Sequence, residues 1–213
     1  MAGPRPTRAN RRKPNRSAKA ERVFLKIPYD DAFENLLLAY ISGISAFGFV
    51  PRATLEIPFG QRRLERILSL IESSEYSVHD MSRVQLNGSA PRTPRFNMPF
   101  ELGLTIGMRD ANHSWIVCES VRRRINKSLS DIDGTDVYIH DGTIRGVFRE
   151  LCNAFVRSGR QPSVTQMMQI YRVLRTNFKD VLKSAGAKDP FNARVFRDLS
   201  VLASAAAGDL VIR

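Results

Sequence analysis

Short apolar runs alternate along most of the chain with longer segments whose apolar residues recur every three or four positions. The short runs predict buried strands, because a central parallel strand packs against helices on both faces. They lie at residues 23–28, 49–57, 76–80, 114–119 and 136–139. The longer segments predict amphipathic helices over residues 30–47, 61–73, 99–109 and 143–157. Residues 121–129 are ambiguous and fit a short basic helix.

Alternating strands and helices predict a parallel sheet covered on both faces. Five strands suit a flavodoxin-like, doubly wound α/β fold with the strand order 2-1-3-4-5. Beyond residue 160 the pattern is purely helical, with one helix of about twenty residues from Val164 and another over residues 192–207. We therefore expect a basic arm (1–21), an α/β domain (22–160) and a C-terminal helical extension (161–213).

The first C-terminal helix carries an apolar stripe rich in methionine and aromatic residues: Val164, Met167, Met168, Tyr171, Leu174 and Phe178. Such a stripe usually belongs to the core. The alternative is an exposed interface for a protein partner or for a second copy of the chain.

Composition narrows the classes of protein to which the chain can belong. Hydrophobic content is 43% and charged content 25%, as in an ordinary globular protein. No apolar run is long enough to span a bilayer, and the N-terminus lacks the apolar segment of a secretory signal. Cys118 and Cys152 have no ligand-like spacing, so we expect them to fill core space. We also expect the protein to be cytoplasmic and to need no metal and no cofactor.

Charge is concentrated at the N-terminus. Residues 1–22 hold eight Lys or Arg against the single acid Glu21, a net +7 out of the chain's +12. These residues are one way to bind nucleic acid, since phosphates release counterions when basic groups bind them. A solubilising tail, or one that docks on an acidic protein, is the alternative, because no aromatic residue interleaves the charges.

Polar residues follow the strands where a doubly wound sheet binds its ligands. In such sheets the site lies beyond the carboxyl ends of the strands, at the switch between strands 1 and 3. Three groups converge there: Pro28, Tyr29 and Asp30 after the first strand; Asp80, Ser82 and Arg83 at and after the third; and Asn97 and Glu101 at the next helix start.

Two carboxylates beside a crevice suit the cleavage of an N-glycosidic bond. Breaking a bond between ribose and base builds positive charge on the sugar, which a carboxylate can stabilise or attack. A second acid can hydrogen-bond or protonate the departing base. Glu101 would take the first role and Asp80 the second, with the neighbouring hydroxyl and amide groups holding the sugar.

Three segments together resemble the nucleoside 2-deoxyribosyltransferase-like superfamily, which is similar in fold to TIR domains. They are Ile27-Pro28-Tyr29-Asp30-Asp31, the strand ending in Asp80, and Met98-Pro99-Phe100-Glu101-Leu102-Gly103. The resemblance covers about residues 22–157. It implies that Glu101 is the nucleophile and that Asp80 contacts the base. It also implies a nucleoside, nucleotide or NAD substrate, as in bacterial relatives that include defence effectors.

Each candidate residue also has a purely structural interpretation. Glu101 suits the dipole at a helix start, Asp80 a turn, and Asn97 and Asp30 helix N-caps. His79 should face away from Asp80 and be structural. The basic residues Arg122, Arg123, Arg124 and Lys127 form either a solvated helix face or a phosphate contact.

Two other functions compete with glycosidic chemistry. Asp30, Asp31 and Asp80 imitate the acidic pair and aspartate of a response-regulator receiver, but the fifth strand ends in Ile139-His140-Asp141 and lacks the lysine that a receiver needs. The other alternative is a non-catalytic module that senses nucleotides or associates with nucleic acid through the arm.

Overall fold

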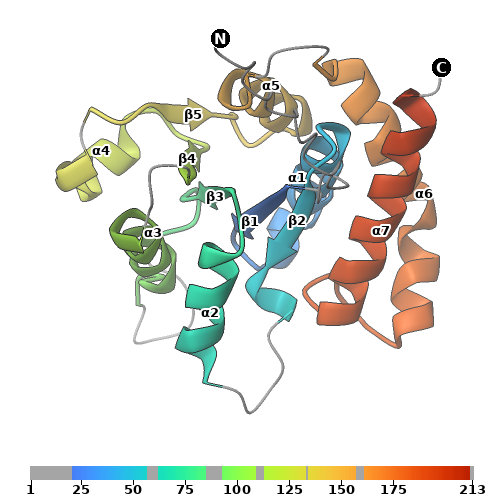
Figure 1. Ribbon diagram of the computed structural model, residues 1–213, viewed down its shortest axis with the longest axis horizontal. Helices are drawn as coiled ribbons and strands as arrows, with labels where there is room; N and C mark the ends of the chain where they lie inside the picture. The colour runs from blue at the N-terminus through green and yellow to red at the C-terminus, as the bar shows by residue number, and fades with distance from the viewer. Residues whose placement is uncertain are drawn as a thin grey trace, which may run out of the picture.

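The five predicted strands form a single parallel sheet in the order β2-β1-β3-β4-β5 (Figure 1). The computed structural model describes residues 21–56, 62–84, 93–108, 113–132, 134–156 and 161–211. The strands are β1 (Arg22–Lys26), β2 (Val50–Ala53), β3 (Tyr76–Asp80), β4 (Ser114–Glu119) and β5 (Val137–Ile139). This order, with helices on both faces, confirms the predicted flavodoxin-like α/β fold. The switch in strand order therefore lies between β1 and β3, as predicted.

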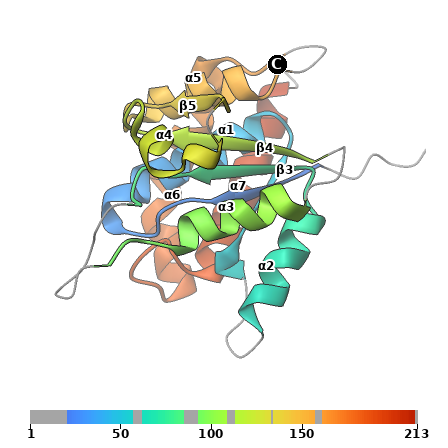
Figure 2. The same ribbon diagram turned by 90° about the vertical axis from the view of Figure 1, so that its left-hand side faces the viewer.

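Helices cover both faces of the sheet (Figure 2). Alternate strand residues pack with different helices, since successive side chains of a strand point to opposite faces. Leu25 and Val78 share a core cluster with α1 (Glu34–Ala46) and α5 (Ile144–Ala154), whereas Phe24 packs with α2 (Arg63–Glu72). On that second face lies α3 (Asn97–Met108), and the short α4 (Arg124–Ser128) follows β4.

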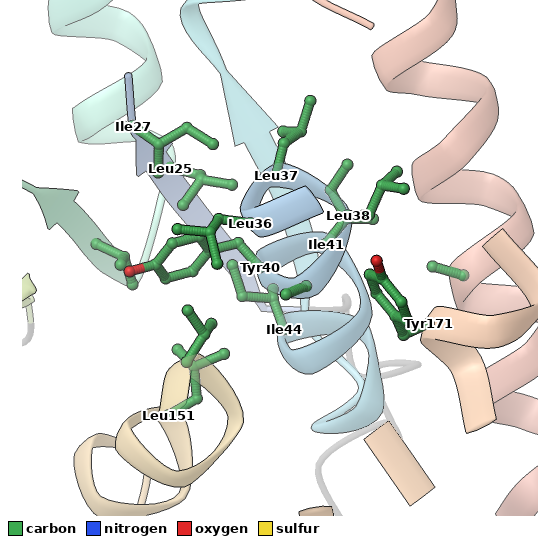
Figure 3. Packing of buried hydrophobic residues seen from close by; sticks show 14 of the residues in the cluster. Leu25, Ile27, Leu36, Leu37, Leu38, Tyr40, Ile41, Ile44, Leu151 and Tyr171 are labelled. Atoms are coloured by element: carbon green, nitrogen blue, oxygen red, sulfur yellow. The ribbon is translucent and has the colours of Figure 1, made fainter. Parts of the chain in front are cut away.

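Helix α1 is the centre of the core. Every residue from Leu36 to Ser45 is buried, so the helix is enclosed on all sides rather than amphipathic. Figure 3 shows side chains from β1, α5 and α6 around it, among them Leu25, Leu151 and Tyr171. A Cβ at Gly43 would collide with the Leu151 side chain, so glycine lets α5 approach α1 closely.

The C-terminal helices α6 (Val164–Ala185) and α7 (Ala193–Val211) pack on α1 (Figure 1). A capping box between Ser163 and Gln166 starts α6, and Gly186, with a φ of +63°, ends it. Met167, Leu174 and Phe178 of the predicted stripe are buried in the same cluster as the sheet. The prediction that this stripe is core is therefore confirmed.

Several predicted element boundaries were wrong. Strand 2 was predicted through residue 57, but it ends at Ala53, where a 3-10 turn (Thr54–Glu56) begins. The Glu56 carboxylate stabilises this turn, because it accepts a hydrogen bond from the Ala53 N–H at 3.0 Å. Helical spacing in residues 61–73 predicts that Leu64 lies on the buried stripe, but Leu64 is exposed and Leu70 is buried instead.

The two predicted N-cap interpretations also fail. Helix α1 does not start at Asp30 but follows a 3-10 turn (Asp31–Phe33), and the Asp30 side chain makes no capping hydrogen bond. Helix α3 already begins at Asn97, so Asn97 is its first residue rather than its cap. Both side chains are thereby left for other contacts.

Across the described part of the chain, no helix combines the length and apolar character needed to cross a bilayer.

Candidate functional site

A pocket of about 290 Å³ opens beyond the carboxyl end of β1, beside the start of α3. We call it the Lys26 pocket. Three predicted site residues line it, namely Pro28, Tyr29 and Asn97. Its other lining residues are Lys26, Ile27, Pro94, Arg95, Phe96 and Met98. The structure therefore brings the strand 1 side of the predicted crevice against the start of α3.

Glu101 lies one helical turn beyond Asn97, and residues four apart share a helix face. Its carboxylate is buried, and Oε1 accepts a hydrogen bond from Lys26 Nζ at 2.7 Å. Oε2 is also buried and has no hydrogen-bond partner among the described residues. Burial raises the pKa of Glu101, and the Lys26 ammonium opposes that rise. Lys26 and Glu101 thus form a buried ion pair behind the pocket wall.

Sequence reasoning missed Lys26, although it left a signal. Lys26 is the one charged residue in the apolar run Val23-Phe24-Leu25-Lys26-Ile27. A lysine in a strand that is covered on both faces must either be paired or lose its charge. Its partner was not predictable, because Glu101 lies 75 positions further along the chain.

Tyr29 joins the pocket to two other parts of the fold. Its hydroxyl is 3.0 Å from Thr54 Oγ1, and its ring centroid is 5.5 Å from Lys26 Nζ, a cation–π distance. The ring of Phe191, in the connection between α6 and α7, lies 5.7 Å from it between centroids. Burial raises the pKa of Tyr29, so the phenol stays protonated. The C-terminal hairpin therefore reaches the pocket wall.

Asp80 is fully buried and faces the other side of the sheet from Glu101. Its Oδ2 accepts from the Tyr40 hydroxyl at 2.7 Å and lies 3.0 Å from His140 Nε2, while Oδ1 accepts from the Ser82 N–H at 2.8 Å. These partners include α1 on one side and the residue after β5 on the other. The two predicted carboxylates are therefore not neighbours, and contact between Asp80 and a base would require one of these bonds to open.

The hydrogen bonds of His140 identify its tautomer. The Gly142 N–H points at Nδ1 at 3.1 Å, so the ring proton is on Nε2 and is directed at Asp80. Ser82 Oγ lies 3.1 Å from the same Nε2. Because that nitrogen carries the proton, it cannot act as a base toward Ser82, and the three residues do not form a nucleophilic triad. They tie the ends of β3 and β5 together.

Arg124 joins this cluster from α4. Its guanidinium bonds both oxygens of the buried Glu119, with Nε 3.0 Å from Oε2, and also donates to the Ser82 carbonyl at 2.6 Å. One member of the predicted basic cluster is thus engaged within the fold, whereas Arg122 and Arg123 are exposed.

Asp30 and Arg83 meet at the mouth of the site together with Arg95. Arg95 Nη1 lies 2.9 Å from Asp30 Oδ2, and Arg83 Nε lies 3.4 Å from the same oxygen. These are ion-pair contacts without hydrogen-bond alignment, since neither buried oxygen of Asp30 has a hydrogen-bond partner among the described residues. Arg95 was not predicted to be a site residue. Its position in the long loop before α3 was the only signal.

His79 faces the second side of the sheet, as predicted, beside Lys26 in the register of β1 and β3. It is fully buried, its ring contacts Phe24 edge-on, and neither ring nitrogen has a partner within the described ranges. Burial lowers the pKa of His79 to about 3, and the charge of Lys26 adds to this effect. The imidazole is therefore neutral at physiological pH.

Comparison of the chain with models of known protein families and with curated proteins finds no match. The resemblance to the nucleoside 2-deoxyribosyltransferase-like superfamily therefore stays a prediction from the quoted motifs. Among the residues that the structure describes, no three His, Cys, Asp or Glu side chains gather as a metal site would require.

Proposed function

We propose that the chain is a cytoplasmic enzyme that cleaves the N-glycosidic bond of a nucleoside, a nucleotide or NAD, with Glu101 as the reacting carboxylate. The observation that carries the proposal is the buried Glu101 carboxylate, which pairs through Oε1 with Lys26 of the pocket wall and has no partner for Oε2 among the residues that the structure describes. An unpartnered buried oxygen is costly, and such groups concentrate at functional sites.

The chemistry follows from these contacts. In the proposed reaction, Oε2 of Glu101 attacks C1′ of the sugar or stabilises positive charge there, as the bond from C1′ to the base nitrogen breaks. The electron pair of that bond leaves with the base, which then takes up a proton. Water attacks C1′ and releases Glu101 as a carboxylate. Transfer to another acceptor would replace water in this last step.

Lys26 has a defined role in this scheme. Because burial raises the pKa of Glu101, the carboxyl would tend to be protonated and unreactive, and the adjacent ammonium counteracts that tendency. Tyr29 and Asn97 line the same pocket and would bond the sugar hydroxyls. Asp80 enters the proposal as the predicted base-side group, although its three protein partners favour a positioning role.

The test compares the wild-type chain with Glu101→Gln on nucleosides, nucleotides and NAD, following base release by chromatography. We expect the wild type to release a base from at least one compound, and the variant to lose at least about 100-fold in rate, because the amide is a poor nucleophile. Glu72→Gln is the control, because Glu72 lies at the exposed end of α2. An inactive wild type, or equal rates for wild type and Glu101→Gln, would refute the catalytic role.

A non-catalytic nucleotide-binding module is the second candidate. The ion pair favours it, since a Lys26–Glu101 contact of 2.7 Å satisfies both charges without any ligand. This candidate predicts that a nucleotide binds and is recovered intact after prolonged incubation. It also predicts that Glu101→Gln binds as well as the wild type.

A further inference from the structure

Two guanidinium groups share one carboxylate at the mouth of the Lys26 pocket. Arg95 and Arg83 both approach Asp30 Oδ2, at 2.9 and 3.4 Å, and neither contact is aligned as a hydrogen bond. Two positive charges against one negative charge leave one positive charge unbalanced. Both arginine side chains are partly exposed, so this charge is open to a solute.

The surplus charge borders the proposed reaction site. Arg95 lines the Lys26 pocket and also a second, mainly apolar pocket of about 240 Å³ around Ile125, which we call the Ile125 pocket. The residues common to both linings are Pro94, Arg95 and Phe96, so this segment is the wall between the pockets. Arg63, at the start of α2, is close enough to lower the pKa of Glu101. The surroundings therefore favour an anion.

Arginine also has the right geometry for such a ligand. A guanidinium offers paired N–H donors that match a phosphate, and it binds phosphate more strongly when two parallel hydrogen bonds form. Neither arginine forms such aligned hydrogen bonds with Asp30. A phosphate with three acceptor oxygens can satisfy both groups at once, which one carboxylate oxygen does not.

We propose that the ligand of the Lys26 pocket is a nucleotide rather than a nucleoside, and that its phosphate displaces Asp30 to bridge Arg83 and Arg95. The inference rests on the proposed function, because it takes the sugar to lie over Lys26 and Glu101. In this arrangement the base of the nucleotide enters the Ile125 pocket and passes the exposed ring of Phe96. Asp30 holds the two arginines in place until the phosphate arrives.

The competing explanation is a purely structural clasp. In sequence, Arg83 and Arg95 flank residues 85–92, which lie outside the described residues, and in this explanation Asp30 only holds the two flanking segments together. The clasp predicts a loss of stability when either arginine is replaced, and no dependence on a ligand phosphate.

Calorimetric titration separates the two explanations. The four ribonucleoside 5′-monophosphates, their parent nucleosides and inorganic phosphate are titrated into the wild type and into Glu101→Gln, which binds without turnover. We expect at least one monophosphate to bind at least about tenfold more tightly than its nucleoside. Equal affinity of each pair, or no binding of any monophosphate, overturns the proposal.

Substitutions then assign the preference to residues. Arg95→Gln and Arg83→Gln should each reduce the preference for phosphate at least about fivefold, and Arg95→Lys should restore part of it. Arg175→Gln is the control, since Arg175 pairs with Glu34 on the α1–α6 side and should leave the preference unchanged. Melting temperatures are measured in parallel, and variants that lose stability but keep the preference support the clasp and overturn the proposal.

The outcomes also distinguish this proposal from the proposed function. Tighter binding of a monophosphate without base release would refute glycosidic cleavage and leave the phosphate site standing. Base release from nucleosides and monophosphates with equal efficiency would refute the phosphate site and leave the cleavage standing.

Discussion

Buried polar side chains decide what the carboxyl end of this sheet can do. Lys26, His79 and Glu101 lie on one side of the sheet, and Asp80 on the other with Tyr40 and His140. The second group is satisfied by mutual hydrogen bonds, which suits a structural role. The first group leaves both His79 nitrogens and Glu101 Oε2 unpartnered within the described chain. These buried atoms without hydrogen-bond partners therefore lie on the side of the sheet that carries the Lys26 pocket.

His79 should make the fold sensitive to acid. Its pKa falls from 6.5 to about 3 on folding, so between these values the folded state binds fewer protons than the unfolded state. The free energy of unfolding therefore decreases as pH falls from 6.5 toward 3, by about 1.4 kcal/mol per pH unit for this group. Chemical denaturation of the wild type and of His79→Leu at several pH values measures this dependence.

We expect His79→Leu to flatten the loss of stability below pH 6.5, because leucine has no proton to take up. The matched control is Val78→Ala, at a buried apolar position of the same strand, which should lower the free energy of unfolding at every pH and keep the wild-type slope. Equal slopes for His79→Leu and the wild type would show that His79 does not titrate in this way.

At the scale of elements, the C-terminal hairpin of α6 and α7 contacts one wall of the Lys26 pocket through Phe191. Its helices cover α1, and its connecting turn places Phe191 against Tyr29, whose ring lies beside Lys26. A segment distant in sequence from the predicted site thus helps to hold a pocket residue. Positioning of this kind acts through packing and does not require contact with the ligand.

Phe191→Ala should weaken ligand binding with little loss of stability, because Phe191 is only partly buried. We expect the KM for base release, or the Kd of a bound nucleotide, to rise about three- to tenfold, while the melting temperature changes by only a few degrees. Val201→Ala, at an exposed position of α7, is the control and should change neither. Unchanged binding by Phe191→Ala would mean that Tyr29 does not need this support.

At the scale of the whole molecule, positive charge is concentrated in a short N-terminal part of the chain. The N-terminal 22 residues carry a net +7, and the remainder carries the other +5 of the total. The arm lies outside the described residues except at Glu21 and Arg22, so its partner is inferred from sequence alone. A contact with nucleic acid through the arm stays a prediction, and it would be separate from the proposed chemistry at Glu101.

Removal of residues 1–20 should therefore abolish binding to nucleic acid and leave base release unchanged. For duplex DNA, log K should fall with log salt concentration by about 0.9 for each phosphate that the arm neutralises. Fluorescence anisotropy with labelled DNA and RNA at several salt concentrations measures this slope. If the truncated chain keeps the affinity and slope of the full chain, the arm is not the binding element.

Local pattern was sufficient to predict the elements and their order. Strand and helix periodicity depends on residues close in sequence, and alternation of the two left few topologies open. The motif around Glu101 was likewise visible, as were Pro28, Tyr29 and Asn97, which the structure places in one pocket. Boundaries were less predictable, because side-chain contacts such as that of Glu56 with the Ala53 N–H ended elements early.

The sequence by itself determined the α/β class, the strand order, the basic arm and the apolar frame of Glu101. Only the tertiary structure decided which charges meet. It paired Glu101 with Lys26, set Asp80 on the opposite face and brought two arginines to Asp30. The physical reason is distance along the sequence. Periodicity depends on residues that are close together in the chain, whereas ion pairs and burial depend on strand register and helix packing between segments that are far apart.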